Sequence, residues 1–232
     1  MKQQDKTGKS GAGMNRTESS NTGITGHKVM YLAPAASGEA LVIEKRSKFI
    51  AVVMPVESEE SAKEEIARIR EKHRDASHNC WCYIIRGGIE RYSDDGEPQG
   101  TAGLPMLEVF RRGGIVDVCC VVTRYFGGTL LGAGGLVRAY SEAAKSALDN
   151  AGIAEYKLHE CLEVVCTYNL QGKIKQELEI PGVIIDKIEY IENVIFRIII
   201  PSGQFETINK RLADASAGDV CGIITGTKYI PF

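Results

Sequence analysis

The sequence predicts an α+β protein made of two domains. Its 232 residues exceed the usual length of a single domain, and strand-like and helix-like patterns alternate along most of them. The composition also changes along the chain: residues 87–135 hold 12 of the 25 glycines, whereas β-branched residues become more frequent after Glu155. We therefore predict a disordered tail over residues 1–26, a first domain over 27–153 and a second domain over 154–232.

The tail and the overall composition exclude several classes of protein. Residues 1–26 are rich in Gly, Ser, Thr, Asn and Lys and contain few large apolar residues, which is typical of disorder. The sequence shows neither a signal-peptide core nor an apolar run near the roughly 20 residues that span a bilayer. Its seven cysteines lack the spacing of a disulfide scaffold. We predict a cytoplasmic protein without a membrane segment. The formal charge of −2 excludes a globally basic nucleic-acid binder, but it allows a local basic patch.

The first predicted domain begins with a strand hairpin over 40–56 that turns at 45–48. A helix follows, with Ser61 and Glu64 as a capping box or Ser58 as the alternative cap. Two β-prone runs joined by Gly87-Gly88 then predict a second hairpin. The apolar run 115–123 is typical of a central strand that is covered on both faces. The remaining elements are strands over 80–86 and 89–93 and helices over 104–112 and 136–150.

The second predicted domain has the element order β-α-β-β-α-β within about 75 residues, which is typical of a ferredoxin-like unit. Turn residues such as Pro181-Gly182 and Glu192-Asn193 separate its elements. The predicted strands are 161–167, 183–190, 194–200 and 220–229, and the predicted helices are 170–179 and 205–213.

Two glycine-rich loops of the first domain hold the candidate chemistry. The loop over 123–138 connects a buried strand to the start of a helix, where backbone N–H groups attract anions. Arg124 and Arg138 flank this loop and can clamp a phosphate. The alternative is a tight packing corner, with Arg124 paired to Asp94 or Asp95. Neither the P-loop nor the dinucleotide-binding fingerprint matches this loop. Its glycines are Gly127, Gly128, Gly132, Gly134 and Gly135.

Two clusters resemble metal sites only weakly. Asp94, Asp95 and Glu97 lie together in the other loop, but they lack the alternating spacing of an EF-hand. His78, Cys80 and Cys82 share one face of a predicted strand, but a fourth zinc ligand has no candidate nearby. Solvated acids and buried core cysteines explain both clusters, and we predict no bound metal and no cofactor.

Four motifs together resemble the signature of the IMPACT family, the YigZ-like proteins. The resemblance covers roughly residues 27–230. It implies a left-handed β-α-β first domain like domain IV of elongation factor G, and a ferredoxin-like second domain. It also implies a role near translation, since eukaryotic members restrain the amino-acid-starvation kinase by competing for its activator. The motifs are Ser93-Asp94-Asp95-Gly96-Glu97-Pro98, Gly100-Thr101-Ala102-Gly103, Val121-Val122-Thr123-Arg124-Tyr125-Phe126-Gly127-Gly128 and Leu131-Gly132-Ala133-Gly134-Gly135-Leu136-Val137-Arg138-Ala139-Tyr140.

We expect a non-enzymatic binding protein that acts in translation, with RNA, the ribosome or a translation-regulatory protein as its partner. The alternative is an enzyme that holds a phosphorylated small molecule or nucleotide at the glycine loop. No catalytic residues follow from the resemblance. The expected binding residues are His78, Arg86, Asp94, Asp95, Glu97, Thr101, Arg124, Tyr125, Gly127, Gly128, Gly132, Gly134, Gly135 and Arg138.

Overall fold

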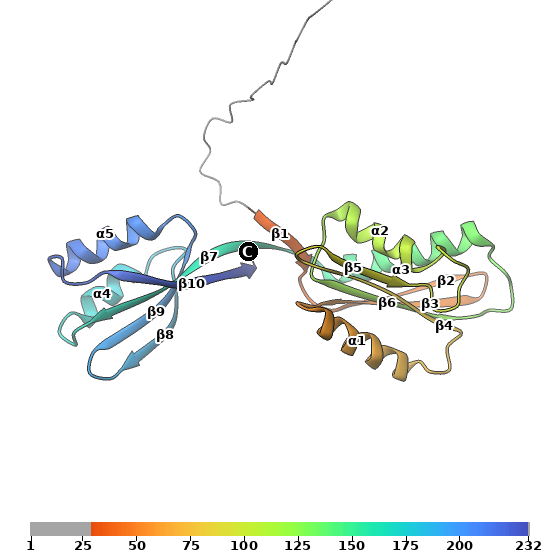
Figure 1. Cartoon of the computed structure of the whole chain (residues 1–232), viewed down its shortest axis with the longest axis horizontal. Coiled ribbons are helices and arrows are strands. Elements are labelled where there is room, and N and C mark those ends of the chain that lie inside the picture. The colour runs from red at the N-terminus through yellow and green to blue at the C-terminus, as the bar shows by residue number, and fades with distance from the viewer. Residues whose placement is uncertain (1–28, 232) are drawn as a thin grey trace, which may run out of the picture.

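The computed structural model describes residues 29–231. They form two β-sheets, each covered by helices, and the two units lie side by side along the long axis (Figure 1). This arrangement confirms the predicted two-domain α+β fold. The predicted disordered tail over 1–26 lies outside the described residues. Within the described part, no helix is both long and apolar enough to span a membrane.

The first sheet has five strands in the order β2-β3-β6-β4-β5, and every neighbouring pair is antiparallel. The apolar strand predicted at the centre is β6, which lies between β3 and β4. Its side chains alternate between two buried cores, as a strand covered on both faces requires. The strands are β2 (Gly38–Glu44), β3 (Ser47–Pro55), β4 (His78–Ile85), β5 (Ile89–Ser93) and β6 (Val118–Tyr125).

Three helices cover the two faces of this sheet (Figure 1). Helix α1 (Glu59–Lys72) packs on one face through Ala62, Ile66 and Ile69. Helices α2 (Gly103–Gly113) and α3 (Ala133–Ala151) cover the other face. The capping box of α1 starts at Ser58 and uses Ser61 as its N3 residue, so the alternative cap is the one that forms.

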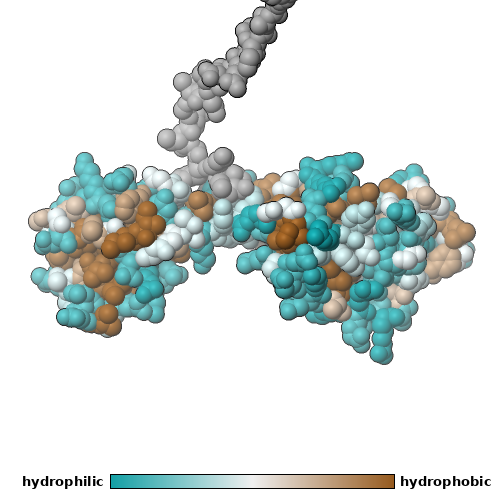
Figure 2. Space-filling model, viewed as in Figure 1, coloured by the Kyte–Doolittle hydropathy of each residue, from teal (hydrophilic) through white to brown (hydrophobic). Residues whose placement is uncertain are grey.

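The second sheet has the strand order of a ferredoxin-like unit. β8 pairs with β9, β9 pairs with β7, and β10 pairs with the opposite edge of β7. Both helices pack on one face of the sheet. Several apolar side chains of this domain are exposed, including Ile223 and Ile191, and Figure 2 shows hydrophobic surface there. The elements are β7 (Ile153–Cys166), α4 (Gln171–Leu178), β8 (Ile184–Tyr190), β9 (Val194–Pro201), α5 (Phe205–Ser216) and β10 (Gly222–Pro231).

A strand that the sequence pattern did not predict joins this second sheet. β1 (Val29–Pro34) pairs with the first residues of β7, from Ile153 to Lys157. Because β10 also pairs with Tyr156, β1 must lie on the edge of β7 that β9 uses further along. The predicted boundary between residues 153 and 154 therefore falls at the start of a strand that is paired on both edges.

An arginine of the first domain fills the junction between the two sheets. The Arg86 guanidinium carbon lies 4.3 Å from the ring centre of Tyr31 and 4.4 Å from that of Tyr229. Tyr31 also stacks on Tyr156 at 4.7 Å. Asp117 holds the backbone of Arg86, because its carboxylate accepts a hydrogen bond from the Arg86 backbone N–H at 2.7 Å. Burial raises the pKa of Tyr31, which keeps its hydroxyl neutral.

Candidate functional site

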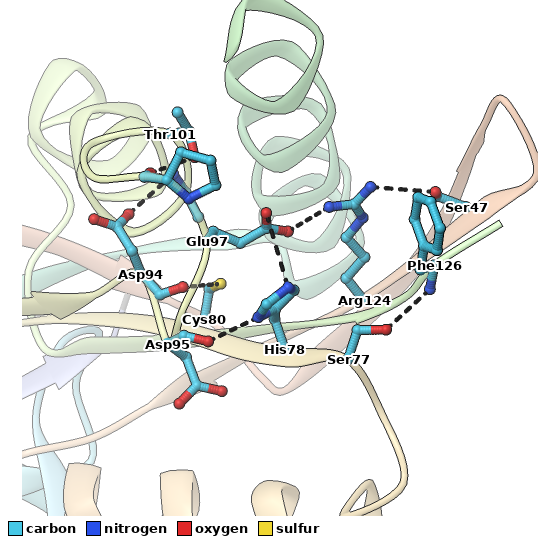
Figure 3. Close-up of polar contacts among 12 residues, drawn as sticks. Ser47, Ser77, His78, Cys80, Asp94, Asp95, Glu97, Thr101, Arg124 and Phe126 are labelled. Carbon is cyan, nitrogen blue, oxygen red and sulfur yellow. Dashed lines mark hydrogen bonds and ion pairs between the residues drawn. The ribbon is translucent and has the colours of Figure 1, made fainter. Parts of the chain in front are cut away.

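The candidate site contains His78 and Arg124, which the first sheet places directly opposite each other. The register pairs His78 of β4 with Arg124 of β6. By alternation along each strand, both side chains lie on the face that α2 and α3 cover, with Cys80 and Val122 as their buried neighbours on that face. Figure 3 shows the two side chains converging on Glu97, which comes from the loop between β5 and α2.

Arg124 and Glu97 form a buried ion pair. Arg124 Nη1 lies 2.7 Å from Glu97 Oε1, and both side chains are almost fully buried. The Tyr140 hydroxyl of α3 donates to the same oxygen at 2.8 Å. Arg124 Nη2 donates to Ser47 Oγ at 3.4 Å. The expected pairing of Arg124 with Asp94 or Asp95 is thus wrong in its partner, because Glu97 of the same loop takes that place.

The two aspartates and Thr101 hold the loop itself in shape. Asp94 accepts hydrogen bonds from the backbone N–H groups of Gly100, Ala102 and Gly103, so it also satisfies the start of α2. Asp95 accepts from Arg70 and from the backbone of Asn79. The Thr101 hydroxyl donates to the carbonyl of Pro98 at 2.6 Å. These contacts make the three residues structural supports of Glu97.

His78 is oriented by the same loop. Its Nδ1 lies 2.8 Å from the carbonyl oxygen of Asp95. A carbonyl oxygen can only accept, so Nδ1 carries a proton and donates it. The other ring nitrogen, Nε2, lies 4.0 Å from Glu97 Oε2. Both hydrogen bonds that Glu97 accepts within residues 29–231 go to Oε1, so Oε2 remains available.

The cysteines beside His78 belong to the core. The Cys80 thiol lies 3.0 Å from the Asp94 carbonyl oxygen and 3.3 Å from the Tyr140 hydroxyl. Burial raises the pKa of Cys80 to about 12, which makes it a poor nucleophile at neutral pH. Cys82 is also fully buried. Among the residues that the structure describes, no three His, Cys, Asp or Glu side chains gather in a way that could hold a metal ion.

The start of helix α3 is left uncapped. Its cap residue is Gly132 at φ 71°, no side chain of the described residues caps it, and its first turn contains no acid. The first hydrogen bond of the helix runs from Leu136 N–H to the Gly132 carbonyl. The N–H groups of Ala133, Gly134 and Gly135 therefore have no intrahelical acceptor, and they carry the positive end of a 19-residue helix dipole.

Two of the loop glycines are explained by packing, and Gly134 is not. A Cβ on Gly127 would lie 2.1 Å from the backbone of Arg46, and one on Gly135 would lie 2.9 Å from Leu131. Gly128 and Gly132 need positive φ angles. Gly134 has neither requirement, since among the described residues no atom beyond its chain neighbours and the backbone of its own helix lies within 4 Å of an added Cβ. Its small size leaves the helix start open to a ligand.

These features border one cleft of about 500 Å³. Four of the expected residues line it: His78, Glu97, Arg124 and Gly132. The buried Nε of Arg124 has no hydrogen-bond partner within residues 29–231. An unpaired buried N–H is costly, by about 1–3 kcal/mol, and a polar ligand in the cleft would offset that cost. The other lining residues are Ser77, Gly96, Pro98, Phe126, Leu130, Leu131, Ala133 and Leu136.

Three expected residues lie elsewhere. Arg86 follows the far end of β4, at the domain junction. Tyr125 follows Arg124 in β6, so alternation turns its side chain to the α1 face. There its hydroxyl contacts His73 and Asp75. Arg138 is exposed on α3 and does not line the cleft. Linear proximity in the sequence grouped these residues, but strand length and alternation separate them.

Sequence reasoning missed the surface beside the cleft. The β2–β3 turn carries Lys45 and Arg46, both exposed and without an ion pair among the described residues. Its backbone packs directly on Gly127. Phe126 is 49% exposed, and its ring lies 5.5 Å from the Arg124 guanidinium carbon. The sequence did contain a signal for this surface, because two basic residues, Lys45 and Arg46, occupy the predicted turn just before the buried Ser47.

Comparison with known proteins assigns both parts of the chain. Residues 45–148 match the model of the Impact N-terminal domain, and residues 164–219 match the model of a domain of unknown function, DUF1949. A Bacillus subtilis (strain 168) protein, IMPACT family member YvyE, is 37% identical over 190 residues, which cover 81% of this chain and 88% of that protein. The chain belongs to the IMPACT family.

A second IMPACT protein and a solved structure agree with this assignment. IMPACT family member YigZ of Escherichia coli (strain K12) is 33% identical over 201 residues, with 82% of this chain and 95% of that protein covered. The crystal structure of a hypothetical protein, 31% identical, superposes with a TM-score of 0.57 over 84% of this chain and 96% of the other. The family match thus covers both domains, and the first domain contains the cleft.

Proposed function

We propose that this IMPACT protein binds RNA through the surface around the cleft and acts in the cytoplasm, in translation or its regulation. The observation that carries the proposal is the uncapped start of α3 in a cleft lined by Arg124. Free N–H groups at a helix start and a guanidinium both bind phosphate well in proteins. The family resemblance supports translation as the process and the ribosome as a setting for the RNA.

The surface outside the cleft favours a polymeric ligand over a small anion. Lys45 and Arg46 extend the positive charge beyond the helix start, and neither forms an ion pair among the described residues. Phe126 presents an exposed ring between the turn and the cleft, where a base can stack. A row of basic side chains beside an aromatic platform is typical of single-stranded RNA binding.

Gly134 offers a sharp test because it lies in open space at the helix start. Gly134→Asp places a negative charge at the start of α3, next to the cleft-lining Ala133, where it opposes a bound phosphate, and the same charge is favourable for the helix dipole. Gly134→Asn is the matched control, since it has nearly the same shape without the charge. Both variants should melt at or above the temperature of the unchanged protein, because glycine inside a helix is destabilising.

The measurement is co-sedimentation with ribosomes, together with fluorescence anisotropy on single-stranded RNA, at two salt concentrations. We expect Gly134→Asp to weaken RNA binding by roughly tenfold or more, which corresponds to the loss of a charge-assisted contact. Gly134→Asn should bind nearly as well as the unchanged protein. Equal binding by all three proteins would show that the helix start is not part of the interface.

A further inference from the structure

When the His78 imidazole is neutral, two hydrogen-bond acceptors face each other in the cleft without a donor between them. His78 Nδ1 donates to the Asp95 carbonyl, so Nε2 of the neutral imidazole is an acceptor. Glu97 Oε2 is also an acceptor, and it lies 4.0 Å from that nitrogen. Figure 3 shows the imidazole edge directed at this carboxylate. A protonated imidazole would donate its Nε2–H to Glu97 as an ion pair, whereas a neutral imidazole and the carboxylate repel each other unless a group with hydrogens lies between them.

A donor that carries two hydrogens satisfies both acceptors at once. Among the four RNA bases, adenine, cytosine and guanine carry an exocyclic amino group, whereas uracil carries none. A uracil ring N–H has one hydrogen, and the carbonyl oxygens beside it would face the two acceptors. The arrangement of His78 and Glu97 therefore suits an amino-bearing base and disfavours uracil.

The rest of the cleft suits a single nucleotide that is turned out of its strand. Its volume of about 500 Å³ lies within the range of pockets that hold small organic ligands. Its walls are apolar at Phe126, Leu130 and Leu136, which can cover the faces of a base. The free N–H groups at the start of α3 lie at the rim, where the phosphate of the same nucleotide can bind.

We propose that the cleft is a base-reading pocket, in which His78 and Glu97 accept the two hydrogens of an exocyclic amino group and so select cytosine over uracil. This inference rests on the proposed RNA binding and specifies which part of the RNA enters the cleft. His78 and Glu97 are specificity-determining residues here, and the helix start with the basic turn provides the affinity for the backbone.

The test compares oligocytidylate with oligouridylate of equal length, about ten nucleotides, which is within the size of single-strand sites. The two pyrimidines have the same ring size and differ at the position of the amino group. Anisotropy titrations at pH 8, which favours neutral imidazole, should give roughly three- to tenfold tighter binding to oligocytidylate. His78→Ala should reduce this preference to near unity and still bind RNA through the backbone contacts.

His73→Ala is the matched control, because His73 is equally half-buried but contacts Tyr125 on the α1 face. It should keep the cytosine preference. Thermal melts of both variants report whether they are folded. The comparison of the two oligonucleotides on the unchanged protein does not depend on either variant. Equal affinity for the two oligonucleotides would mean that only water lies between His78 and Glu97, and it would overturn this inference while leaving RNA binding in place. Binding to neither would overturn both.

Discussion

At the scale of single residues, the ion pair between Arg124 and Glu97 contributes both to the fold and to the lining of the cleft. The pair is almost fully buried and is shared with Tyr140 and Ser47. Removing only one partner of a buried ion pair is strongly destabilising, because the other partner remains as a buried charge without compensation. Loss of binding after a change at Arg124 therefore has to be separated from loss of folding.

Arg124→Ala should lower the free energy of unfolding by about 3–5 kcal/mol, since it leaves the Glu97 carboxylate buried and unpaired. The double change Arg124→Met with Glu97→Leu should recover most of that loss, because it removes both charges and fills similar volume. Urea denaturation of the three proteins measures both effects. If the double variant is less stable than Arg124→Ala alone, then the pair itself stabilises the fold.

Cysteine reactivity gives a second residue-scale prediction. At pH 8, a thiol with a pKa of about 12, as Cys80 has, is ionised in about one molecule in ten thousand. Cys82, Cys119, Cys120 and Cys166 are buried as well, whereas Cys221 is exposed. A thiol reagent on the native protein should therefore label Cys221 first, and mass spectrometry identifies the labelled site. Fast labelling of Cys80 would show that its pocket opens in solution.

The sequence could identify the loops that contain the site but not the pairing inside them. Alternation along the two strands puts His78 and Arg124 on one face, and that much follows from residue order. The choice of Glu97 over Asp94 or Asp95 depends on how the loop turns. Asp94 is committed to three backbone N–H groups, which no spacing rule predicts.

At the scale of elements, the β2–β3 turn needs positive φ angles at two positions, and both positions are occupied by residue types that disfavour them. Lys45 and Arg46 have φ angles of 46° and 67°, a region that disfavours both residue types. Two-residue hairpin turns of this kind prefer Asn-Gly. Strain of this sort is commonly kept at functional sites, and here it keeps two basic side chains beside the cleft.

Replacing Lys45-Arg46 by Asn-Gly should therefore raise stability and weaken RNA binding together. We expect a gain of roughly 1 kcal/mol in the free energy of unfolding, from relief of two unfavourable φ angles. The slope of log affinity against log salt should become shallower by roughly one to two phosphate contacts. Urea denaturation and salt titrations measure the two effects. An unchanged salt slope would exclude the turn from the RNA interface.

Element prediction from the sequence succeeded where periodicity and turn residues agree. The Gly87-Gly88 hairpin, the central strand β6 and the end of α3 at Gly152 all follow from such signals. β1 and the first half of β7 were not predicted. Their partners lie far apart in the sequence, and residues such as Glu155, Lys157 and Glu160 interrupt the apolar pattern. Pairing with distant strands stabilises them.

At the scale of the whole molecule, Arg86 connects the two domains. Its guanidinium lies over Tyr31 and Tyr229 of the second sheet, and Asp117 holds its backbone in the first domain. A cation over two aromatic rings contributes about 0.5–1 kcal/mol for each ring at a partly exposed site. That is enough to favour one orientation of the domains without making it rigid.

Arg86→Ala should leave both domain cores intact and widen the range of domain orientations. Small-angle scattering should show a broader distance distribution, while the melting temperature falls by only a few degrees. Arg91→Ala is the control, since Arg91 is exposed on β5 and its side chain donates only to the carbonyl of Glu90 within the described chain. An identical scattering profile for Arg86→Ala would show that strand pairing alone sets the orientation.

The position of β1 has a consequence for how the protein folds during its own synthesis. β1 leaves the ribosome before any other described element, but its partner on β7 follows about 120 residues later, which takes roughly 6–24 seconds at ordinary elongation rates. During that interval the first domain can complete its sheet from β2 to β6, because it needs nothing from β7. The nascent chain therefore carries a folded first domain, which β1 contacts through the bridge between Leu32 and Ile115, while the main strand partner of β1 is still missing. Arrest of translation at successive lengths, combined with protease protection, should show β1 becoming fully protected only after β7 has emerged, because the bridge to Ile115 holds only the end of the strand near Leu32.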